Sequence, residues 1–356
     1  MSATLAAVDV RPVPRTVDPL ARGDWLALVQ RAPDASIFHH PAWLSLLRDT
    51  YGYAIEACCV AAPDGRLLGG LPVAEVSSRL TGRRLVALPF SDLCPPLIAP
   101  EAPPGTEVAL RDALARLRMD RGVPLEVRGD GPALRGAAPG ERFHHHVIAL
   151  EDDVAAVARR FTKPQVSRGV RRAVREGLQT SRCVDRAALL AFYRLHAATR
   201  GRLGVPTQPR RFILGFEELF QQGLGFVLLV HREGEPMAAA VFLTFGETLL
   251  YKYGASDARW LQMRPNNLLF MEAIRCGCEH GMRTLDLGRT HWGQESLRAF
   301  KLAWGAQEHE LRYRYVGGGA PVARGARGQR MLAAVIRRTP PLAGRVIGEV
   351  LYRHAG

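Results

Sequence analysis

The chain has 356 residues, of which 47 % are hydrophobic, and a formal net charge of +14. This length exceeds what one hydrophobic core usually organises, so two domains are expected, each with enough apolar material for its own core. The positive charge favours an anionic partner, such as RNA, a phosphorylated or nucleotide-linked precursor or an acidic membrane surface, or it reflects a solvated, arginine-rich composition.

The cysteines, the histidines and the hydrophobic stretches of the chain each argue against one kind of protein. Six irregularly spaced cysteines without a CxxC pair exclude a disulfide scaffold and indicate buried thiols in a reducing cytoplasm. Neighbours in the run His144, His145 and His146 would point to opposite faces of a strand, so no metal site is assigned. The N-terminus has no signal-peptide pattern and no apolar stretch reaches membrane-spanning length, which predicts a cytoplasmic protein, soluble or peripheral at the inner membrane face.

The first part of the chain reads as a mixed α and β unit. Residues 1–17 are predicted to form a flexible tail, and a first domain is expected at residues 18–152. Its predicted helices cover residues 25–31, 40–51 and 108–121, and its predicted strands cover 54–61, 67–76, 84–88, 124–128 and 143–150. A turn at Pro63, Asp64 and Gly65 joins the first two strands into a hairpin.

A second domain, expected at residues 153–316, repeats this order of elements. Its predicted helices cover residues 154–177, 187–200, 210–222 and 267–280, and its strands cover 225–232, 236–245, 248–255 and a segment that ends at Asp286. Antiparallel strands, a helix and a further strand follow one another in acetyltransferase-like folds. The sequence therefore predicts two such domains in tandem, although no residue-level repeat accompanies the repeat of topology.

Residues 317–356 are predicted to form a linker and an amphipathic tail. The segment VGGGAPVARGARGQ has the composition of a linker, and Leu342, Val346 and Val350 share one helical face beyond it. Such a helix either lies on an anionic membrane surface or packs back on the second domain.

The densest basic run lies between residues 159 and 175 and contains six arginines and Lys163. At helical spacing Arg168, Arg172 and Arg175 share a face, and no acidic residue follows before Glu176. This face either binds a phosphate-bearing partner or is a solvated surface.

A phenylalanine–lysine pair stands out because the chain has only three lysines, Lys163, Lys252 and Lys301. A short strand at 284–287, a turn at 288–290 and a helix at 294–304 would place Phe300 and Lys301 on the last turns of that helix. There the ammonium can stabilise a carbonyl oxygen under attack and the ring can stack on a flat donor group. The alternative is a surface lysine beside a core phenylalanine.

Three further positions near this pair are candidates for a site. Asp286 ends the short strand, where it orients an amine or a loop, or caps the turn through Gly288. Arg264 and Asn267 lie where a helix begins, which is either an anion site or an ordinary helix start. Acetyltransferase-like enzymes that use acetyl-CoA generally hold its pyrophosphate in a glycine-containing turn at this helix start. Residues 259–267 contain no glycine, which disfavours CoA.

Several segments together resemble the FemAB-like family. They are FHHPAWLSLLRDTYGY, FTKPQVSRGVRRAVREG and MRPNNLLFMEAIRCGCEHGMRTLDLGRT followed by ESLRAFKLAWGA. The most similar subgroup is associated with exosortase (PEP-CTERM) and exopolysaccharide systems. The resemblance spans residues 38–315 and is most specific over residues 264–305.

The resemblance implies a fold and a type of reaction. The fold would be α/β, with two tandem acyl-CoA N-acyltransferase (GNAT)-like domains, and the reaction would transfer an acyl or aminoacyl group to an amine. In the best understood members the donor is aminoacyl-tRNA and the acceptor is an amine of a peptidoglycan precursor. The pair matching Phe300 and Lys301 lies at the donor end, with the lysine placed to stabilise the carbonyl oxygen. This chain lacks the long helical hairpin that some members use with tRNA.

The resulting prediction is an N-acyltransferase or aminoacyltransferase acting on an amine of a peptidoglycan or exopolysaccharide precursor. Lys301, Phe300 and Asp286 are the predicted catalytic residues. The predicted donor- and substrate-binding residues are Arg168, Arg172, Lys252, Tyr253, Arg264, Asn267 and Arg289. No tightly bound cofactor is expected, and the acyl donor would be aminoacyl-tRNA or acyl-CoA.

The expected partners are an anionic small-molecule or lipid-linked precursor, aminoacyl-tRNA and an anionic membrane surface. Two other functions fit the same sequence features: a CoA-dependent N-acyltransferase, and a non-catalytic membrane-surface binding protein of an envelope biosynthesis cluster. The oligomeric state does not follow from the sequence.

Overall fold

The computed structural model describes residues 12–21, 23–78, 82–318, 336, 348–349 and 351–352. The elements of the first half of the chain are β1 (Val13–Val17), α1 (Gly23–Arg31), η1 (Ile37–His39), α2 (Pro41–Tyr51), β2 (Ala54–Ala61), β3 (Leu67–Ser78), β4 (Gly82–Val86), β5 (Leu97–Ile98), α3 (Thr106–Arg121), β6 (Leu125–Val127), η2 (Pro132–Leu134) and β7 (Ala138–Ala149). The mixed α and β class predicted from the sequence is confirmed.

The described part of the second half continues with fourteen elements. They are α4 (Val154–Arg159), α5 (Pro164–Arg175), β8 (Gln179–Cys183), α6 (Arg186–Leu203), α7 (Arg210–Leu214), α8 (Phe216–Gln221), β9 (Gly225–Arg232), β10 (Glu235–Phe245), β11 (Thr248–Ser256), η3 (Ala258–Met263), α9 (Pro265–Glu279), β12 (Thr284–His291), α10 (Glu295–Ala303) and β13 (Gln307–Val316).

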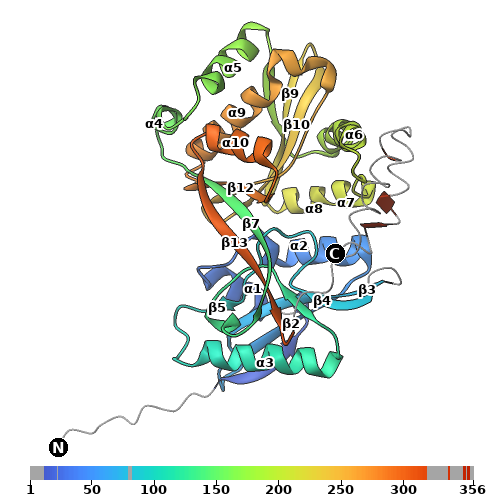
Figure 1. Ribbon diagram of the computed structural model, residues 1–356, viewed down its shortest axis with the longest axis vertical. Coiled ribbons are helices and arrows are strands. Elements are labelled where there is room, and N and C mark those ends of the chain that lie inside the picture. The colour runs from blue at the N-terminus through green and yellow to red at the C-terminus, as the bar shows by residue number, and fades with distance from the viewer. Residues whose placement is uncertain are drawn as a thin grey trace, which may run out of the picture.

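One mixed sheet of 13 strands runs through the whole molecule, in the order β1-β2-β3-β4-β6-β13-β7-β12-β11-β10-β9-β8, with β5 paired to β3. In Figure 1 the long strands β7 and β13 cross the middle of the molecule and join its two halves. β13 pairs with β6 of the first half, and β7 pairs with β12 of the second half. The halves thus exchange a strand, and the domain boundary at residues 152 and 153 stays a prediction.

Packing as well as strand pairing unites the two halves. One hydrophobic cluster extends from Val17 to Val316 and includes Trp43 of α2 together with Phe212 and Phe216 of α7 and α8. The Trp43 ring lies 6.0 Å from the Phe212 ring. Such aromatic contacts bury large apolar area, so the inter-half contact has the character of a protein interior. Any site between the halves is therefore held by a rigid frame.

Several elements differ from the sequence prediction for identifiable reasons. The predicted flexible tail includes β1, which pairs with β2 at the sheet edge, where Pro14 is tolerated. The single predicted helix 154–177 is two helices, because Pro164 begins α5. The predicted turn after Leu287 is wrong, since β12 continues to His291 through a register shift between Asp286 and Arg289. The strands β8 and β13 were not predicted.

Three other expectations concern the cysteines and the chain ends. All six cysteines are free and five of them are buried, as predicted. No helix in the described ranges has the length and apolarity needed to cross a bilayer. The predicted linker and tail at residues 317–356 lie mostly outside the described residues. Of their described residues, Tyr352 packs on the body: its hydroxyl donates to the Pro206 carbonyl at 3.1 Å, and its ring lies 5.6 Å from that of Phe90.

Candidate active site

A basic cleft with a volume of about 950 Å³ is lined by residues of α5, α9 and α10. These three helices lie in the upper half of Figure 1. The sequence of α5 builds the wall of the cleft: Val166, Gly169 and Ala173 are buried, whereas the arginines lie on the exposed side. The cations that line the cleft are Lys163, Arg168, Arg172, Arg175 and Arg264. None of its described lining residues is an aspartate or glutamate.

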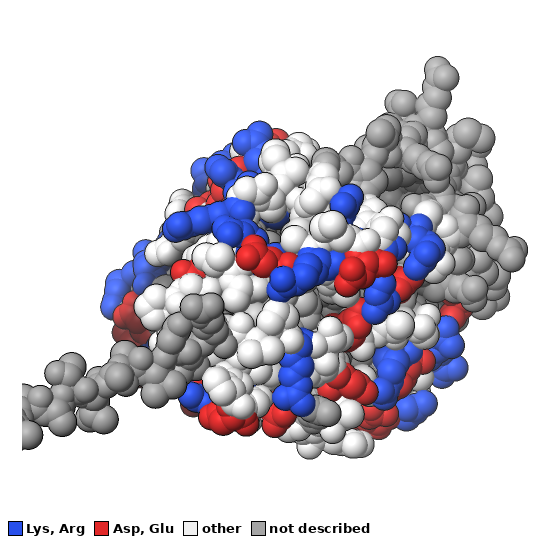
Figure 2. All heavy atoms as spheres, turned by 90° about the horizontal axis from the view of Figure 1, so that it is seen from below, with Lys and Arg blue, Asp and Glu red and all other residues white. Residues whose placement is uncertain are grey.

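The cations of the cleft have few acidic partners. Among the described residues, the only recorded ion pair of the five is that of Arg172 with Glu176, at 3.5 Å on the exposed helix surface. Elsewhere the surface is mixed: the face in Figure 2 carries acidic and basic side chains side by side. The cleft therefore concentrates positive potential, as a site for a phosphate-bearing ligand requires.

The α5 and α9 helices approach each other closely at the floor of the cleft. A Cβ at Gly169 would lie 2.6 Å from the Asn267 side chain, so a larger residue there would displace that side chain. The Asn267 amide donates a hydrogen bond to the Val166 carbonyl at 3.4 Å. Asn267, predicted to bind the donor, lines the cleft but also joins the two helices.

The N-terminus of α9 also opens into the cleft. Arg264 precedes the helix in the left-handed conformation with a φ of 63°, Pro265 follows at the first helical position, and no side chain caps the helix. The first backbone N–H groups of a helix carry partial positive charge. In α9, Pro265 has no N–H and the Asn267 N–H donates to the Arg264 carbonyl at 3.0 Å, which leaves the Asn266 N–H for a ligand. This end of α9 therefore adds anion-binding capacity to the cations of the cleft.

Phe300 of α10 forms part of the apolar wall of the cleft. Its ring lies 5.1 Å from that of Phe270 and 6.4 Å from that of Trp304, and both contacts are edge-to-face. Phe270 also contacts Tyr251 of β11 at 4.9 Å. The ring of Phe300 is half-buried, so one part of it remains available to a ligand in the cleft.

Lys301 points away from the cleft, toward β12. Its side chain is buried, and Nζ donates to the carbonyl oxygens of Gly288 at 2.9 Å and Arg289 at 3.2 Å. Burial lowers the pKa of Lys301 to about 8, although Asp92 and Asp286 act in the opposite direction. Lys301 is thus not the surface lysine of the alternative reading, and its ammonium is held at a defined place on β12.

A bulge in β12 creates the carbonyl pair that Lys301 contacts. The register of β12 against β7 shifts between Asp286 and Arg289, and Gly288 has a φ of +68°. Its N–H donates to Asp286 Oδ1 at 2.7 Å, which is the turn cap foreseen for Asp286. The bulge directs the carbonyls of Gly288 and Arg289 to the same ammonium.

We expect Gly288→Ala to reduce the free energy of unfolding by about 1–2 kcal/mol, because a residue with a Cβ is strained at positive φ. Urea unfolding measures this difference. Gly201→Ala is the matched control, since Gly201 lies in α6 with open space around it, and there alanine should stabilise by about 0.5–1 kcal/mol. Equal effects of the two substitutions would show that the bulge is not strained.

Asp286 has a second partner from the first half of the chain. His145 of β7 contacts Asp286 Oδ1 through Nε2 at 2.8 Å. Burial alone would lower the pKa of His145, but the hydrogen bond and charge of Asp286 raise it above its usual value. The neighbouring His144 and His146 both contact Glu308, on the other face of β7, as alternation along a strand predicts. The described residues contain no group of three or more potential metal ligands.

Lys252 and Arg289, both predicted to bind substrate, instead meet an internal anion. Lys252 donates to Asp92 Oδ2 at 3.3 Å and to the Phe90 carbonyl at 2.7 Å, and its side chain is 3 % exposed. Arg289 Nε lies 3.5 Å from Asp92 Oδ1. Burial alone would raise the pKa of Asp92, but the charges of Lys252 and Arg289 lower it below its usual value.

Asp92 was not identified from the sequence. It lies in the loop between β4 and β5, 160 residues from Lys252, and nothing in SDLCPP distinguishes it from other loop acids. Tyr253, another predicted binding residue, does not line the cleft but borders this ion cluster, since Lys252 Nζ lies 5.3 Å from the centre of its ring. Its ring also packs against His196 at 5.7 Å and Phe216 at 6.2 Å, and its binding role stays a prediction.

The strands β11 and β12 separate beside these groups. They pair in parallel only from Thr248 with Thr284 to Leu250 with Asp286, after which β11 continues to Ser256 and β12 turns to β7. Lys252 follows the last paired residue of β11 closely, and Gly288 follows that of β12. The predicted residues therefore lie in two groups: Arg168, Arg172, Arg264, Asn267 and Phe300 at the cleft, and Asp286, Arg289, Lys252 and Lys301 at the divergence of the strands.

Comparisons with known proteins support the fold described above. Residues 159–302 match the family model of the acetyltransferase (GNAT) domain. No curated protein matches the chain significantly. The structure of FemX is similar with a TM-score of 0.64 at 16 % identity, over 84 % of this chain and 96 % of FemX.

Two other structures share the fold. The C-terminal domain of a putative lysylphosphatidylglycerol synthetase from Agrobacterium fabrum has a TM-score of 0.54 at 12 % identity, over 87 % of this chain and 95 % of that domain. A tandem GNAT protein from the clavulanic acid biosynthesis pathway has a TM-score of 0.51 at 14 % identity, over 86 % of this chain and 100 % of that protein. The predicted fold class is confirmed. The chain is an acyltransferase with the tandem GNAT fold, and its residues 159–302 match the acetyltransferase domain.

Proposed function

We propose that this acyltransferase moves an acyl or aminoacyl group to an amine of a cell-envelope precursor, as FemAB-like enzymes do. One observation carries the proposal: five cations and no carboxylate line a cleft that ends at Phe300, next to Lys301. An activated donor with phosphate groups fits this cleft electrostatically. The carbonyl of such a donor would then be delivered to the divergence of β11 and β12.

The donor is aminoacyl-tRNA in this proposal. Arg168, Arg172 and Arg264 contact its phosphates, and the face of Phe300 stacks on a base near the aminoacyl ester. The resemblance to a putative lysylphosphatidylglycerol synthetase supports the donor, because that protein is named for a lipid that carries an aminoacyl group. The acceptor is a peptidoglycan or exopolysaccharide precursor, the latter in the exosortase (PEP-CTERM) setting, at the cytoplasmic face of the inner membrane.

The reaction requires little acid–base chemistry from the protein. The neutral acceptor amine attacks the ester carbonyl, a carbon–nitrogen bond forms, and the carbon–oxygen bond to the ribose breaks. The nitrogen loses one proton and the leaving ribose oxygen gains one. Lys301 stabilises the negative charge that develops on the carbonyl oxygen, and the cleft supplies proximity. To reach that oxygen, the ammonium exchanges one of its two backbone carbonyl contacts for the substrate.

A CoA-dependent N-acyltransferase is the second candidate. The separation of β11 and β12 and the match of residues 159–302 to an acetyltransferase domain favour it. The helix start at Arg264 argues for a different donor, because the preceding turn has no glycine whose backbone would surround a pyrophosphate. In both candidates the reaction at the amine is the same, and only the donor differs.

A product assay distinguishes the donors. Purified protein is mixed with amine-bearing envelope precursors and with either an aminoacyl-tRNA pool or acetyl-CoA, and the products are identified by mass. A gain of one aminoacyl residue that depends on tRNA supports the proposal. A gain of an acetyl group from acetyl-CoA alone supports the second candidate, and no transfer from either donor contradicts both.

The arginines of α5 should govern donor affinity. We expect Arg168→Gln with Arg172→Gln to weaken donor binding by roughly 10-fold or more, because each change removes a charge-assisted hydrogen bond to phosphate, and to make binding less salt-dependent. Filter binding or calorimetry at two salt concentrations measures this. Arg111→Gln on α3, whose guanidinium pairs with Asp112 at 3.4 Å, is the control and should leave binding unchanged. Equal losses in both variants would exclude a specific role for α5.

A further inference from the structure

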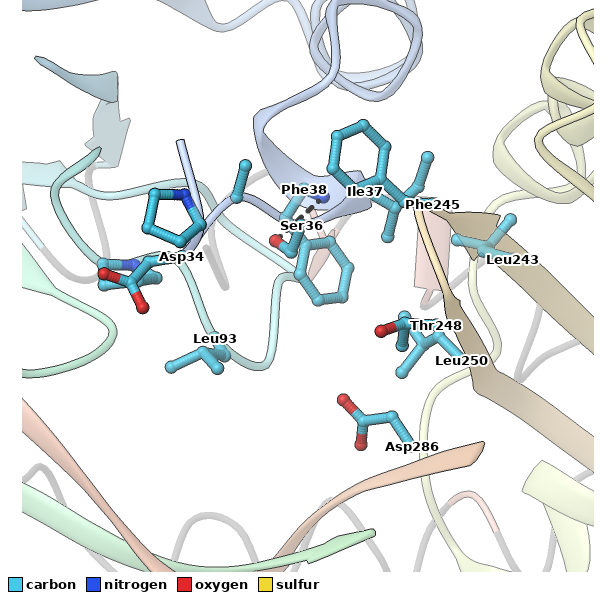
Figure 3. A pocket seen from close by; sticks show the side chains of 13 residues that line it. Asp34, Ser36, Ile37, Phe38, Leu93, Leu243, Phe245, Thr248, Leu250 and Asp286 are labelled. Atoms are coloured by element: carbon cyan, nitrogen blue, oxygen red, sulfur yellow. Dashed lines mark hydrogen bonds between the residues drawn. The ribbon is translucent and has the colours of Figure 1, made fainter. Parts of the chain in front are cut away.

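A second cavity lies between the two halves, on the other face of the sheet from α9. Leu243, Phe245, Thr248, Leu250 and Asp286 line it from β10, β11 and β12, and their spacing of two residues along the strands places them on one face. The segment that contains η1 and the loop after β4 close it from the first half, as Figure 3 shows with Phe38 and Leu93. Its volume is about 240 Å³.

The walls of this cavity are apolar, but a carboxylate faces it from each side. Asp286 points into it from β12, and Asp34 lies at the opposite side, where its side chain is exposed (Figure 3). Both recorded hydrogen bonds of Asp286 end on Oδ1, from Gly288 and from His145. Within the described part of the chain, no hydrogen bond is recorded for Asp286 Oδ2.

The cations closest to this cavity already have acidic partners. Lys252 lies 4.7 Å from the centre of the Phe38 ring, which lines the cavity, and pairs with Asp92. His145 pairs with Asp286. Within the described residues, three polar groups of the cavity have no recorded hydrogen bond: Asp286 Oδ2, the Asp34 carboxylate and the Thr248 hydroxyl. The carboxylate oxygens carry negative charge and accept hydrogen bonds only. A ligand that matches them has a donor with positive charge at one end of an apolar body.

The cavity ends close to the place where Lys301 is held. Asp286 lies two residues before Gly288, whose carbonyl accepts from Lys301 Nζ at 2.9 Å. Phe300, the neighbour of Lys301, lines the basic cleft on the opposite side of β12. A group bound at Asp286 and a donor bound in the cleft would thus approach the same stretch of β12 from two sides.

We propose that this cavity binds a primary amine on an unbranched alkyl stem, with the amine at Asp286 Oδ2 and the stem between Phe38, Leu243 and Leu250. Resting on the proposed function, the bound amine is the acceptor of the acyl group: the ammonium first gives one proton to Asp286 Oδ2, and the neutral amine then attacks the ester carbonyl. The volume suits this ligand, since one water molecule needs only about 10–15 Å³ and the cavity has about 240 Å³. A lysine side chain, with its four-carbon stem, has the matching shape and chemistry.

Ligand-observed NMR without any donor tests the proposal. The probes are n-butylammonium, n-butanol and butyrate, which share a stem and differ in charge. Wild-type protein should bind n-butylammonium roughly 10- to 100-fold more tightly than n-butanol, and butyrate should not compete. Asp286→Asn keeps the shape of the side chain and should remove the preference for the ammonium. Leu250→Phe should weaken binding of both n-butylammonium and n-butanol, because it narrows the apolar part of the cavity.

The control is Asp257→Asn, a carboxylate of similar exposure at the start of η3, outside the cavity. Equal binding of the three probes, or equal effects of Asp286→Asn and Asp257→Asn, would overturn the proposal. The assay is independent of acyl transfer. Amine binding in a protein that transfers no group would leave the cavity assignment standing and contradict the proposed function, and transfer without amine binding at Asp286 would do the reverse.

Discussion

Replacing Lys301 by methionine should lower the rate constant of acyl transfer by about 10²–10³-fold, the loss expected when one donor to a developing oxyanion is removed. Methionine keeps an unbranched side chain of similar length, so the apolar packing of α10 is largely retained. The change also leaves the carbonyl oxygens of Gly288 and Arg289 without their donor. Thermal unfolding of the variant therefore accompanies the kinetic measurement, and the loss is attributed to catalysis only for a folded protein.

The dependence of the rate on pH identifies what Lys301 does. The pKa of Lys301 is lowered by burial to about 8, so the ammonium is the main form below that pH and the neutral amine above it. If the ammonium stabilises the oxyanion, the rate constant at saturating substrate falls as pH rises through 8. A general base would give the opposite slope.

A second substitution tests whether the pH dependence of the rate comes from the loss of a proton by Lys301. Lys301→Arg retains positive charge throughout this pH range, so the activity that remains should no longer fall above pH 8. A rate constant in Lys301→Met close to that of the wild type would show that Lys301 serves only to hold β12. Because the acceptor amine also loses its proton as pH rises, the two profiles are compared: a wild-type rate that does not fall relative to that of Lys301→Arg above pH 8 would exclude the oxyanion role.

The elements that were predicted well are those whose own residues form a pattern typical of a strand. β9 was predicted with its observed bounds, and β10 and β11 within one residue, because each is a run of apolar residues between turns. β13 was missed although its buried Leu311, Tyr313 and Tyr315 alternate with arginines, a pattern typical of a strand with one buried face. Its partners β6 and β7 lie far away in the sequence, and only their pairing makes this polar segment a central strand.

In the candidate site, too, the features that depend on residues close in sequence were predicted, and the contacts with residues far away in sequence were not. The helical spacing of Arg168 and Arg172 and the helix start at Arg264 predicted members of the basic cleft, because each depends on residues close in sequence. The burial of Lys252 and Arg289 depends on Asp92, which no spacing rule connects to them. Cationic side chains predicted to meet a ligand anion were thus found with an anion of the protein itself.

Asp92→Asn should lower the free energy of unfolding by about 3–5 kcal/mol, the cost typical of removing one partner from a buried ion pair. The side chain of Lys252 is 3 % exposed, so its charge would remain in the interior without a carboxylate. Urea unfolding at neutral pH measures the loss. Asp130→Asn is the control, because Asp130 is 47 % exposed beside Arg314, and there the loss should stay below about 1 kcal/mol.

The pH dependence and a double variant test whether the unpaired charge is the cause. Because the pKa of Asp92 is lowered in the folded protein, its carboxylate contributes stability at neutral pH that is lost as pH falls through the folded-state pKa. The Asn variant should lose this part of the acid sensitivity. Adding Lys252→Met to Asp92→Asn removes the buried ammonium and should restore part of the stability. If the double variant were less stable than Asp92→Asn alone, Lys252 would stabilise the fold through its contacts with Phe90 and Phe38 rather than through its charge pair.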